Sequence, residues 1–147
     1  RRKNVDRLTP ERRSWLMSRV ASKNTSAEIR VRQIAHSLGL RFRLHRRDLP
    51  GSPDLVFPRY KTALFVHGCF WHRHPGCKKA SIPKSHTEYW LKKFDRNTAR
   101  DHAVAEELER MGWRPVIVWE CETKNKQMLS EFLAQLFNTD GATNSGA

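Results

Sequence analysis

Residues 54–67, with the sequence DLVFPRYKTALFVH, contain two short apolar runs separated by a turn at residues 58–61. The second run, residues 62–67, is typical of a buried central strand, and residues 54–57 predict a shorter strand beside it. Because only four residues connect the two runs, we expect them to pair as neighbours in one sheet.

Two further strands extend this sheet. In residues 40–44 Leu40, Phe42 and Leu44 alternate with basic residues, which predicts a half-buried strand with a basic outer face. Residues 113–120 predict an apolar strand that follows a long helix. The first three strands therefore form a meander, and the last joins in parallel through a right-handed crossover.

Helix boundaries complete the element order. Expected starts are Thr9 with Pro10, the capping box at residues 25–28, Thr87 and Thr123, and expected stops are Gly39 and Gly112. The order ααβββαβα predicts an α/β fold with a mixed central sheet flanked by helices. We expect one domain over residues 1–137, followed by a frayed tail at residues 138–147.

The charge is strongly positive and uneven. The chain has 28 basic and 15 acidic residues, and residues 1–50 hold 14 of the basic and 4 of the acidic ones. Such a balance favours a polyanionic partner, so we expect residues 1–24 to form a basic DNA-binding arm. The alternative is a basic surface that serves solubility alone. No apolar run is long enough for a membrane span or a secretory signal, and the odd number of cysteines favours a reducing compartment.

Histidine and cysteine gather in residues 67–86, which hold four of the seven histidines and two of the three cysteines. His74 and Cys77 have a spacing that allows both to bind one zinc ion. Cys121 and either Asp101 or His102 could complete the set. The alternative is an exposed histidine with two buried, inert thiols.

Asp54 begins one strand and His67 ends its neighbour, so we expect both near one edge of the sheet. One carboxylate, a main-chain carbonyl and substrate phosphates suffice for Mg²⁺, and a neutral histidine can move a proton. This combination suits phosphodiester hydrolysis. The alternative is that Asp54 is only a turn residue. For Glu28, the capping box by itself explains why a glutamate stands at this position.

Adjacent aromatic residues, Phe70 and Trp71, stand in the histidine-rich segment, and Trp90 lies near the start of the following helix. Exposed aromatic rings can stack on bases or wedge between them. Met17 on the basic first helix is a candidate second wedge. Core packing is the alternative for all of these residues.

Several motifs together resemble the very short patch repair (Vsr) mismatch endonucleases. They are GSPDLV at residues 51–56, FVHGCFWH at 65–72, TEYWL at 87–91, residues 97–101, residues 112–113, and VWEC at 118–121. The resemblance runs from about Ser14 to about Phe137. It implies a restriction-endonuclease-like core and Mg²⁺-dependent nicking of one strand, 5′ of the mismatched T in T·G pairs that arise when 5-methylcytosine deaminates.

The resemblance also implies roles for individual residues. Asp54 matches the Mg²⁺-binding aspartate, His72 the residue that activates water, and His67 and Glu28 further active-site residues. Val66 replaces a threonine and is expected to offer its main-chain carbonyl to Mg²⁺. The matching structural zinc ligands are His74, Cys77, Asp101 and Cys121, and the matching DNA-intercalating residues are Phe70, Trp71, Trp90 and Met17.

The expected partner is double-stranded DNA with a T·G mismatch, bound by a monomer. The resemblance implies a functional link to a cytosine-5 DNA methyltransferase, contacts with mismatch-repair proteins, and a place at the nucleoid in the bacterial cytoplasm. Two alternatives remain open. One is a zinc-stabilised DNA-binding module without catalysis, and the other is a restriction-type nuclease that cuts matched DNA.

Overall fold

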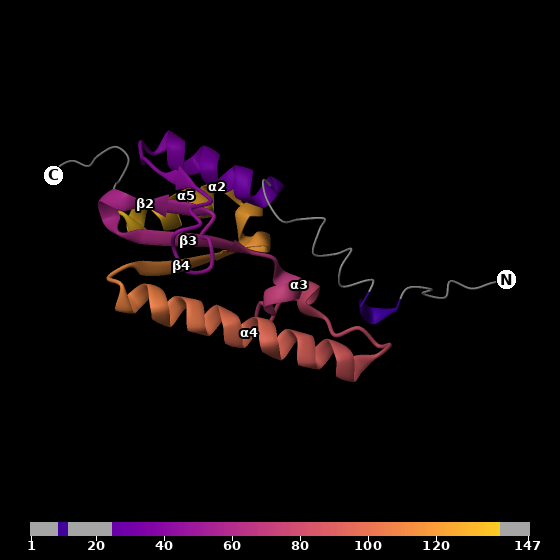
Figure 1. Cartoon of the computed structure of the whole chain (residues 1–147). Helices are drawn as coiled ribbons and strands as arrows, with labels where there is room; N and C mark the ends of the chain where they lie inside the picture. Colours follow the sequence, from indigo (N-terminus) through magenta and orange to yellow (C-terminus); the bar gives the residue numbers. More distant parts are fainter. Residues whose placement is uncertain (1–8, 12–24, 139–147) are drawn as a thin grey trace.

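The computed structural model describes residues 9–11 and 25–138, and shows a four-stranded sheet between helices (Figure 1). Apart from residues 9–11, the predicted arm, Met17 and residues 139–147 lie outside this part of the chain. The helices are α2 (Ser26–Ser37), α3 (Cys69–His72), α4 (Thr87–Arg110) and α5 (Lys126–Leu136); the strands are β1 (Arg43–Leu44), β2 (Leu55–Phe57), β3 (Thr62–His67) and β4 (Arg114–Trp119). Short 3₁₀ turns are η1 (Pro58–Tyr60), η2 (Lys78–Ala80) and η3 (Glu120–Lys124).

The sheet has the strand order β1-β2-β3-β4. β1, β2 and β3 are antiparallel, and β4 pairs in parallel with β3, so the predicted meander and crossover are confirmed. The predicted strand over residues 40–44 is wrong in extent, because only Arg43 and Leu44 pair and Leu44 is 40% exposed. His45, with a φ of 49°, turns the chain away from the sheet directly after them.

The two faces of the sheet are covered by different helices (Figure 1). Alternate strand residues point to opposite faces, as the two-residue period of a strand requires. On one face Leu55, Phe57 and Leu64 pack into a core that includes residues of α2 and α5. On the other, Val56, Ala63 and Phe65 form a second core with Leu108 of α4. The result is a three-layer α/β/α arrangement.

Helix starts follow the predictions only in part. Thr25 caps α2 as expected, since its hydroxyl accepts a hydrogen bond from the Glu28 amide at 3.1 Å. α5 begins after Asn125, whose side chain accepts from the Met128 amide. The predicted cap Thr123 is wrong, because its hydroxyl donates to the Glu120 carbonyl inside η3.

The N-terminus of α4 also differs from the expectation. His86 is its N-cap, in a left-handed conformation and without a side-chain hydrogen bond to the helix. Thr87, the predicted cap, is the first helical residue, and its hydroxyl lies within hydrogen-bond distance of the Pro83 and Lys84 carbonyls. No helix within residues 9–11 and 25–138 is both long and apolar enough to cross a bilayer.

The histidine- and cysteine-rich segment at residues 67–86 contains α3, a single helical turn directly after β3. Arg73 ends this turn in a left-handed conformation. Its guanidinium lies 3.8 Å from the Phe94 ring of α4 and donates hydrogen bonds to the carbonyls of Phe70 and Ala80. Arg73 therefore fixes α3 and the following loop against α4.

The carboxyl ends of β3 and β4 meet at one edge of the sheet, because the strands are parallel and His67 is in register with Trp119. α3 leaves β3 at this edge, and η3 leaves β4 there. Residues from two separate parts of the sequence, β3 with α3 and β4 with η3, are thus brought to the same place.

Candidate active site and metal centre

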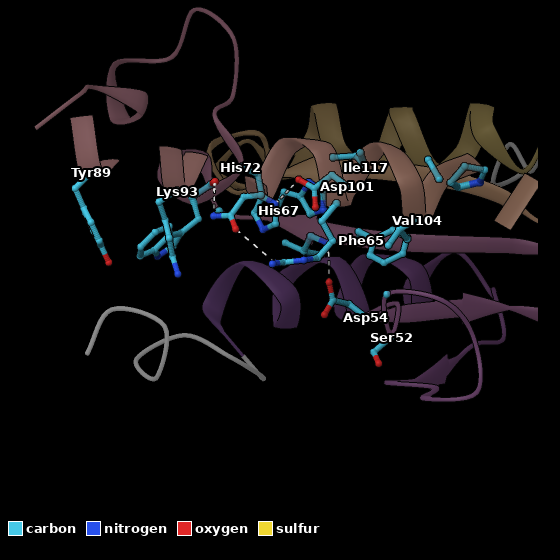
Figure 2. Close-up of a pocket in the computed structure, with 18 of the residues that line it drawn as sticks. Ser52, Asp54, Phe65, His67, His72, Tyr89, Lys93, Asp101, Val104 and Ile117 are labelled. Carbon is cyan, nitrogen blue, oxygen red and sulfur yellow. Dashed lines mark hydrogen bonds and ion pairs between the residues drawn. The ribbon is translucent and has the colours of Figure 1, made fainter. Parts of the chain in front are cut away.

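A cleft of about 890 Å³ opens beside the end of β3, between α4, α3 and the turn before β2 (Figure 2). Among the residues that line it are Ser52, Asp54, Phe65, Val66, His67, Trp71, His72, Tyr89, Lys93, Asn97, Arg100 and Asp101. The cleft therefore contains three of the four residues predicted to be catalytic: Asp54, His67 and His72.

Asp54 is held at the start of β2 by the sheet itself. Its amide donates to the Leu64 carbonyl at 3.0 Å, and its carboxylate Oδ2 accepts a 2.7 Å hydrogen bond from the Val66 amide. Burial, with a smaller contribution from the nearby Glu28 carboxylate, raises the pKa of Asp54 to about 6, against the lowering effect of the Val66 amide. A neighbouring cation would stabilise the ionised form of a carboxylate in this setting.

Val66 contacts Asp54 through its main chain. Its side chain packs against the core on the α2–α5 side of the sheet. The contact with Asp54 therefore needs no hydroxyl at this position, so the change from threonine leaves it intact. The role of the Val66 carbonyl as a Mg²⁺ ligand stays a prediction.

His72 and Asp101 form a pair across the cleft. His72 Nδ1 lies 2.6 Å from Asp101 Oδ2, and both side chains are partly exposed (Figure 2). Because the carboxylate accepts, Nδ1 donates, which leaves Nε2 with the lone pair of the neutral ring. Such a histidine can take a proton from water, and the carboxylate stabilises the imidazolium that forms.

His67 packs directly against His72 of this pair. Its ring stacks on that of His72, with centroids 3.8 Å apart and planes 10° apart. The His67 side chain is 7% exposed, and Nδ1 has no hydrogen-bond partner among the described residues. Burial, reinforced by the nearby His72, lowers the pKa of His67 to about 4, so the ring is neutral at pH 7.

Glu28 does more than its capping position suggests. It is 3% exposed, and its Oε2 accepts a 2.8 Å hydrogen bond from Arg32 and lies 2.5 Å from His45 Nε2. Neither Arg32 nor His45 was among the candidate residues. The four-residue spacing of Glu28 and Arg32 on one helix could have indicated the first contact.

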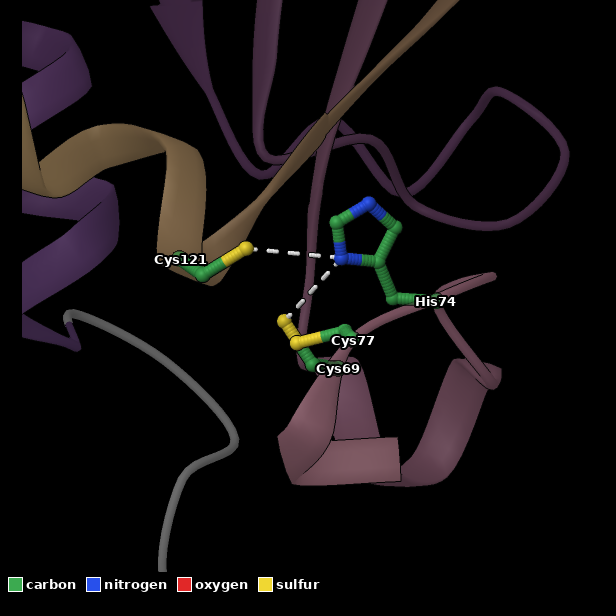
Figure 3. Close-up of side chains that lie close together, drawn as sticks. All are labelled: Cys69, His74, Cys77 and Cys121. Atoms are coloured by element: carbon green, nitrogen blue, oxygen red, sulfur yellow. Dashed lines mark hydrogen bonds between the residues drawn. The ribbon is translucent and has the colours of Figure 1, made fainter. Parts of the chain in front are cut away.

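The metal centre brings three of the four predicted ligands together. His74, Cys77 and Cys121 converge with Cys69, and all four ligand atoms lie within 4.8 Å of one another (Figure 3). His74 Nδ1 is 3.4 Å from Cys121 Sγ and 3.7 Å from Cys69 Sγ. Tetrahedral zinc with ordinary bond lengths separates sulfur and nitrogen ligands by about 3.6 Å.

The donor set fits zinc. Three free thiols and one imidazole form a Cys₃His set, which is typical of structural zinc sites. The main-chain amide of Lys79 lowers the pKa of the Cys77 thiol, while burial raises that of Cys69. A bound cation would hold both as thiolates. The structure thus contains a plausible zinc site made of these four side chains.

Asp101 is not part of this centre, which corrects the predicted ligand set. It pairs with His72, and Cys69 is the fourth member of the cluster. Asp101 shares one face of α4 with Asn97 and Val104, which line the cleft, so helical period places it there. His102, the other candidate, is exposed on α4.

The candidate metal centre lies at the same edge of the sheet as the cleft. The His74 ring stacks on Trp119 at the end of β4, with centroids 4.4 Å apart. Cys69 begins α3, and Cys121 belongs to η3. A zinc ion here would therefore join α3 to the element that follows β4, and so hold His72 in position.

The predicted intercalating residues lie in one aromatic cluster. Phe70 and Trp71 of α3 are partly buried, with ring centroids 5.2 Å apart. Trp90 is only 2% exposed and Phe94 3%, and both rings contact the α3 pair. Phe70 and Trp71 are therefore the accessible members, and Trp90 supports them. Met17 lies outside the described residues.

Similarity to known proteins agrees with this arrangement. Residues 5–79 match the family described as DNA mismatch endonuclease Vsr. The chain is 50% identical over 134 residues to the type II nicking enzyme V.XorIIP of Xanthomonas oryzae pv. oryzae, covering 91% of this chain and 98% of that protein. It is 43% identical over 132 residues to the type II nicking enzyme V.NmeAIP of Neisseria meningitidis, covering 90% and 94%.

A third relative carries the family name itself. The DNA mismatch endonuclease Vsr of Escherichia coli is 39% identical over 119 residues, which cover 81% of this chain and 76% of that protein. Residues 5–79, which match the family, contain Asp54, His67 and His72 of the cleft and three members of the metal cluster, Cys69, His74 and Cys77. By its sequence match and its extensive similarity to these relatives, the chain belongs to the Vsr family of DNA mismatch endonucleases.

Proposed function

We propose that this chain nicks one DNA strand on the 5′ side of the mismatched T in a T·G pair, by Mg²⁺-dependent phosphodiester hydrolysis. The observation that carries the proposal is the His72–Asp101 pair, which faces the same cleft as Asp54. T·G pairs produced by deamination of 5-methylcytosine are the expected substrate.

The chemistry follows from the arrangement of side chains in the cleft. Asp54 and the Val66 carbonyl would hold Mg²⁺, which supplies positive charge to the scissile phosphate. His72 accepts a proton from the attacking water through Nε2, and Asp101 stabilises the resulting imidazolium. His67 remains neutral beneath His72 and therefore adds no charge that would lower its basicity.

Recognition of the mismatch would depend on the aromatic cluster. Inserting a wedge into a base step costs a few kcal/mol, and less where the pair is mismatched. Phe70 and Trp71 supply the wedge, and Trp90 and Phe94 brace it from α4. The net charge of +13 provides the attraction to phosphates that holds the complex together.

The biological setting is part of the proposal. Relatives are named as mismatch endonucleases and as type II nicking enzymes. We expect the chain to act as a monomer at the nucleoid of the bacterial cytoplasm, together with a cytosine-5 DNA methyltransferase and in contact with mismatch-repair proteins. Structural zinc at the Cys₃His site would keep α3 in its active position.

A strand-labelled nicking assay tests this function. Duplexes with a central T·G pair in varied flanking sequences are compared with matched duplexes, in Mg²⁺, for the natural chain and for Asp54→Ala. We expect cuts 5′ of the mismatched T that disappear in Asp54→Ala while DNA binding persists. Cutting of matched DNA would favour a restriction-type nuclease, and binding without cleavage would favour a non-catalytic module.

A further inference from the structure

Three side chains of types that bind metal ions converge next to the cleft, which they reach through Asp54. Glu28 comes from the first turn of α2, His45 from the residue after β1, and Asp54 from the residue before β2. One ligand atom from each lies within 4.8 Å of the other two. This cluster, which we call the Glu28 cluster, shares Asp54 with the proposed Mg²⁺ position and contains none of the zinc-site residues.

The backbone places His45 where it can serve as a ligand. Its amide donates a 3.2 Å hydrogen bond to the Asp54 carbonyl, so the two residues lie on adjacent chain segments. The chain then takes a left-handed conformation at His45, with a φ of 49°. As a result the imidazole reaches α2, and its Nε2 lies 2.5 Å from Glu28 Oε2.

The charges of the cluster favour a cation. Glu28 is 3% exposed and Asp54 is partly buried, so the two carboxylates repel each other in a weakly solvated setting. Arg32 bonds to Glu28 Oε2 at 2.8 Å and offsets one of these charges.

We infer that Glu28, His45 and Asp54 bind a divalent cation that accepts nitrogen ligands, with Mn²⁺ preferred over Mg²⁺. Imidazole suits transition metals, whereas Mg²⁺ prefers oxygen ligands and retains its waters. This position is additional to that of the proposed Mg²⁺, and the inference rests on the proposed function only through their shared ligand, Asp54. Octahedral binding requires Glu28 and His45 to separate their ligand atoms to about 3 Å, a small side-chain shift.

Mn²⁺ binding to the DNA-free, zinc-loaded chain tests the inference without any cleavage reaction. Free Mn²⁺ is counted by electron paramagnetic resonance during a titration, and electron spin echo modulation of bound Mn²⁺ reveals whether a nitrogen is coordinated. We expect one Mn²⁺ per chain with a nitrogen signal. We also expect equimolar Mg²⁺ to leave that Mn²⁺ bound.

Variants assign the nitrogen to its residue. In His45→Gln, Mn²⁺ affinity should fall at least about tenfold and the nitrogen signal should vanish, since an amide is a poor substitute for imidazole. His36→Gln, which changes an exposed histidine at the end of α2, should behave as the natural chain does. Glu28→Gln provides a second, isosteric test should His45→Gln fail to fold.

Two results would overturn the inference. One is the absence of nitrogen-coordinated Mn²⁺ in the natural chain. The other is a nitrogen signal that persists in His45→Gln but disappears in His72→Gln, which would assign the cation to the His67, His72 and Asp101 group instead. Because the readout is binding, failure of the T·G nicking assay leaves this result unaffected, and the two proposals fail separately.

Discussion

Asp101 Oδ2 lies 2.6 Å from His72 Nδ1, so the middle of α4 orients the ring that α3 presents to the cleft. Asp101→Asn keeps the shape of this contact but removes the charge that stabilises the imidazolium. We expect single-turnover nicking of T·G duplexes to slow by about 10²–10⁴-fold, with DNA affinity within about threefold of the natural chain. Asp95→Asn, an exposed change on the same helix, serves as the matched control.

The same variant separates the two roles considered for Asp101. We expect Asp101→Asn to retain one zinc per chain, measured by atomic absorption after dialysis. Loss of zinc together with activity would return Asp101 to the zinc ligands and contradict its assignment to His72.

Cys69 is expected to be the fourth zinc ligand. In Cys69→Ser, zinc affinity should fall by about 100-fold or more, because a thiolate is replaced by a weaker hydroxyl ligand. Cobalt substitution checks the donor set, since the intensity of sulfur-to-cobalt charge transfer scales with the number of thiolates. The natural chain should show three thiolates and the variant two; equal intensities in both would exclude Cys69.

The Mg²⁺ concentration that nicking requires should depend on pH, because Asp54 must be ionised to bind the cation. Since the pKa of this carboxyl is raised to about 6, it is protonated below that pH and must lose its proton to bind a cation. The Mg²⁺ concentration that gives half-maximal nicking should therefore rise about tenfold for each pH unit below 6, and stay level above it. A requirement that is constant from pH 5 to 8 would contradict the assignment.

The raised pKa of Asp54 also has a consequence for stability. A carboxyl whose folded-state pKa lies above its unfolded value of 3.8 stabilises the fold fully below pH 3.8, and loses this contribution as pH rises through about 6. In Mg²⁺-free, zinc-loaded protein, Asp54→Asn should therefore raise the free energy of unfolding by about 1–2 kcal/mol at pH 7.5, after allowance for partial exposure. Urea titrations at pH 4 and 7.5 measure this difference, which should shrink at the lower pH.

The aromatic wedge can be tested by truncating Trp71. We expect Trp71→Ala to reduce the preference for T·G over matched duplexes by about 5- to 100-fold, because stacking on a base contributes roughly 1–3 kcal/mol. A 2-aminopurine beside the mismatch reports base unstacking by its fluorescence. Phe132→Ala, which truncates an exposed ring on α5, should change neither quantity.

The basic arm predicts a steep dependence of DNA binding on salt. Residues 1–8 carry four basic side chains, at Arg1, Arg2, Lys3 and Arg7. Replacing all four by glutamine should reduce the slope of log K against log salt concentration by about 0.9 for each phosphate that the arm no longer neutralises. An unchanged slope would mean that these residues do not bind phosphates.

Most of the fold could be predicted from local patterns. β3 begins and ends where the apolar run at residues 62–67 indicates, and β4 and α4 lie close to their predicted ranges. Helix caps were less predictable, because a threonine near a helix start can bond to a loop carbonyl instead, as Thr87 and Thr123 do. The short extent of β1 depends on the backbone turn at His45, which no pattern in the sequence indicates.

The sequence predicted most of the residues that make up the site, but not which of them contact one another. The sequence suggested that His72, Asp101, Cys77 and Cys121 were functional, but it did not suggest Cys69 or show which of these residues would meet. Cys69 reaches the metal cluster only because α3 forms, and α3 lacks a side-chain cap at Gly68, so contacts with α4 rather than local preference stabilise it. Likewise, His45 and Glu28 meet through tertiary packing over 17 residues of sequence.

The four residues of α3 contribute to three different parts of the site within one helical turn. Cys69 meets the metal cluster, Phe70 and Trp71 form the accessible aromatic pair, and His72 meets Asp101. Successive helical residues are rotated by about 100°, so inserting or deleting one residue here would misdirect every side chain beyond it. A change in the length of this turn would therefore disturb the metal cluster and the His72–Asp101 pair together. Insertions and deletions that alter DNA recognition should therefore be tolerated only in elements outside α3, which makes those elements the better targets for directed evolution by length changes.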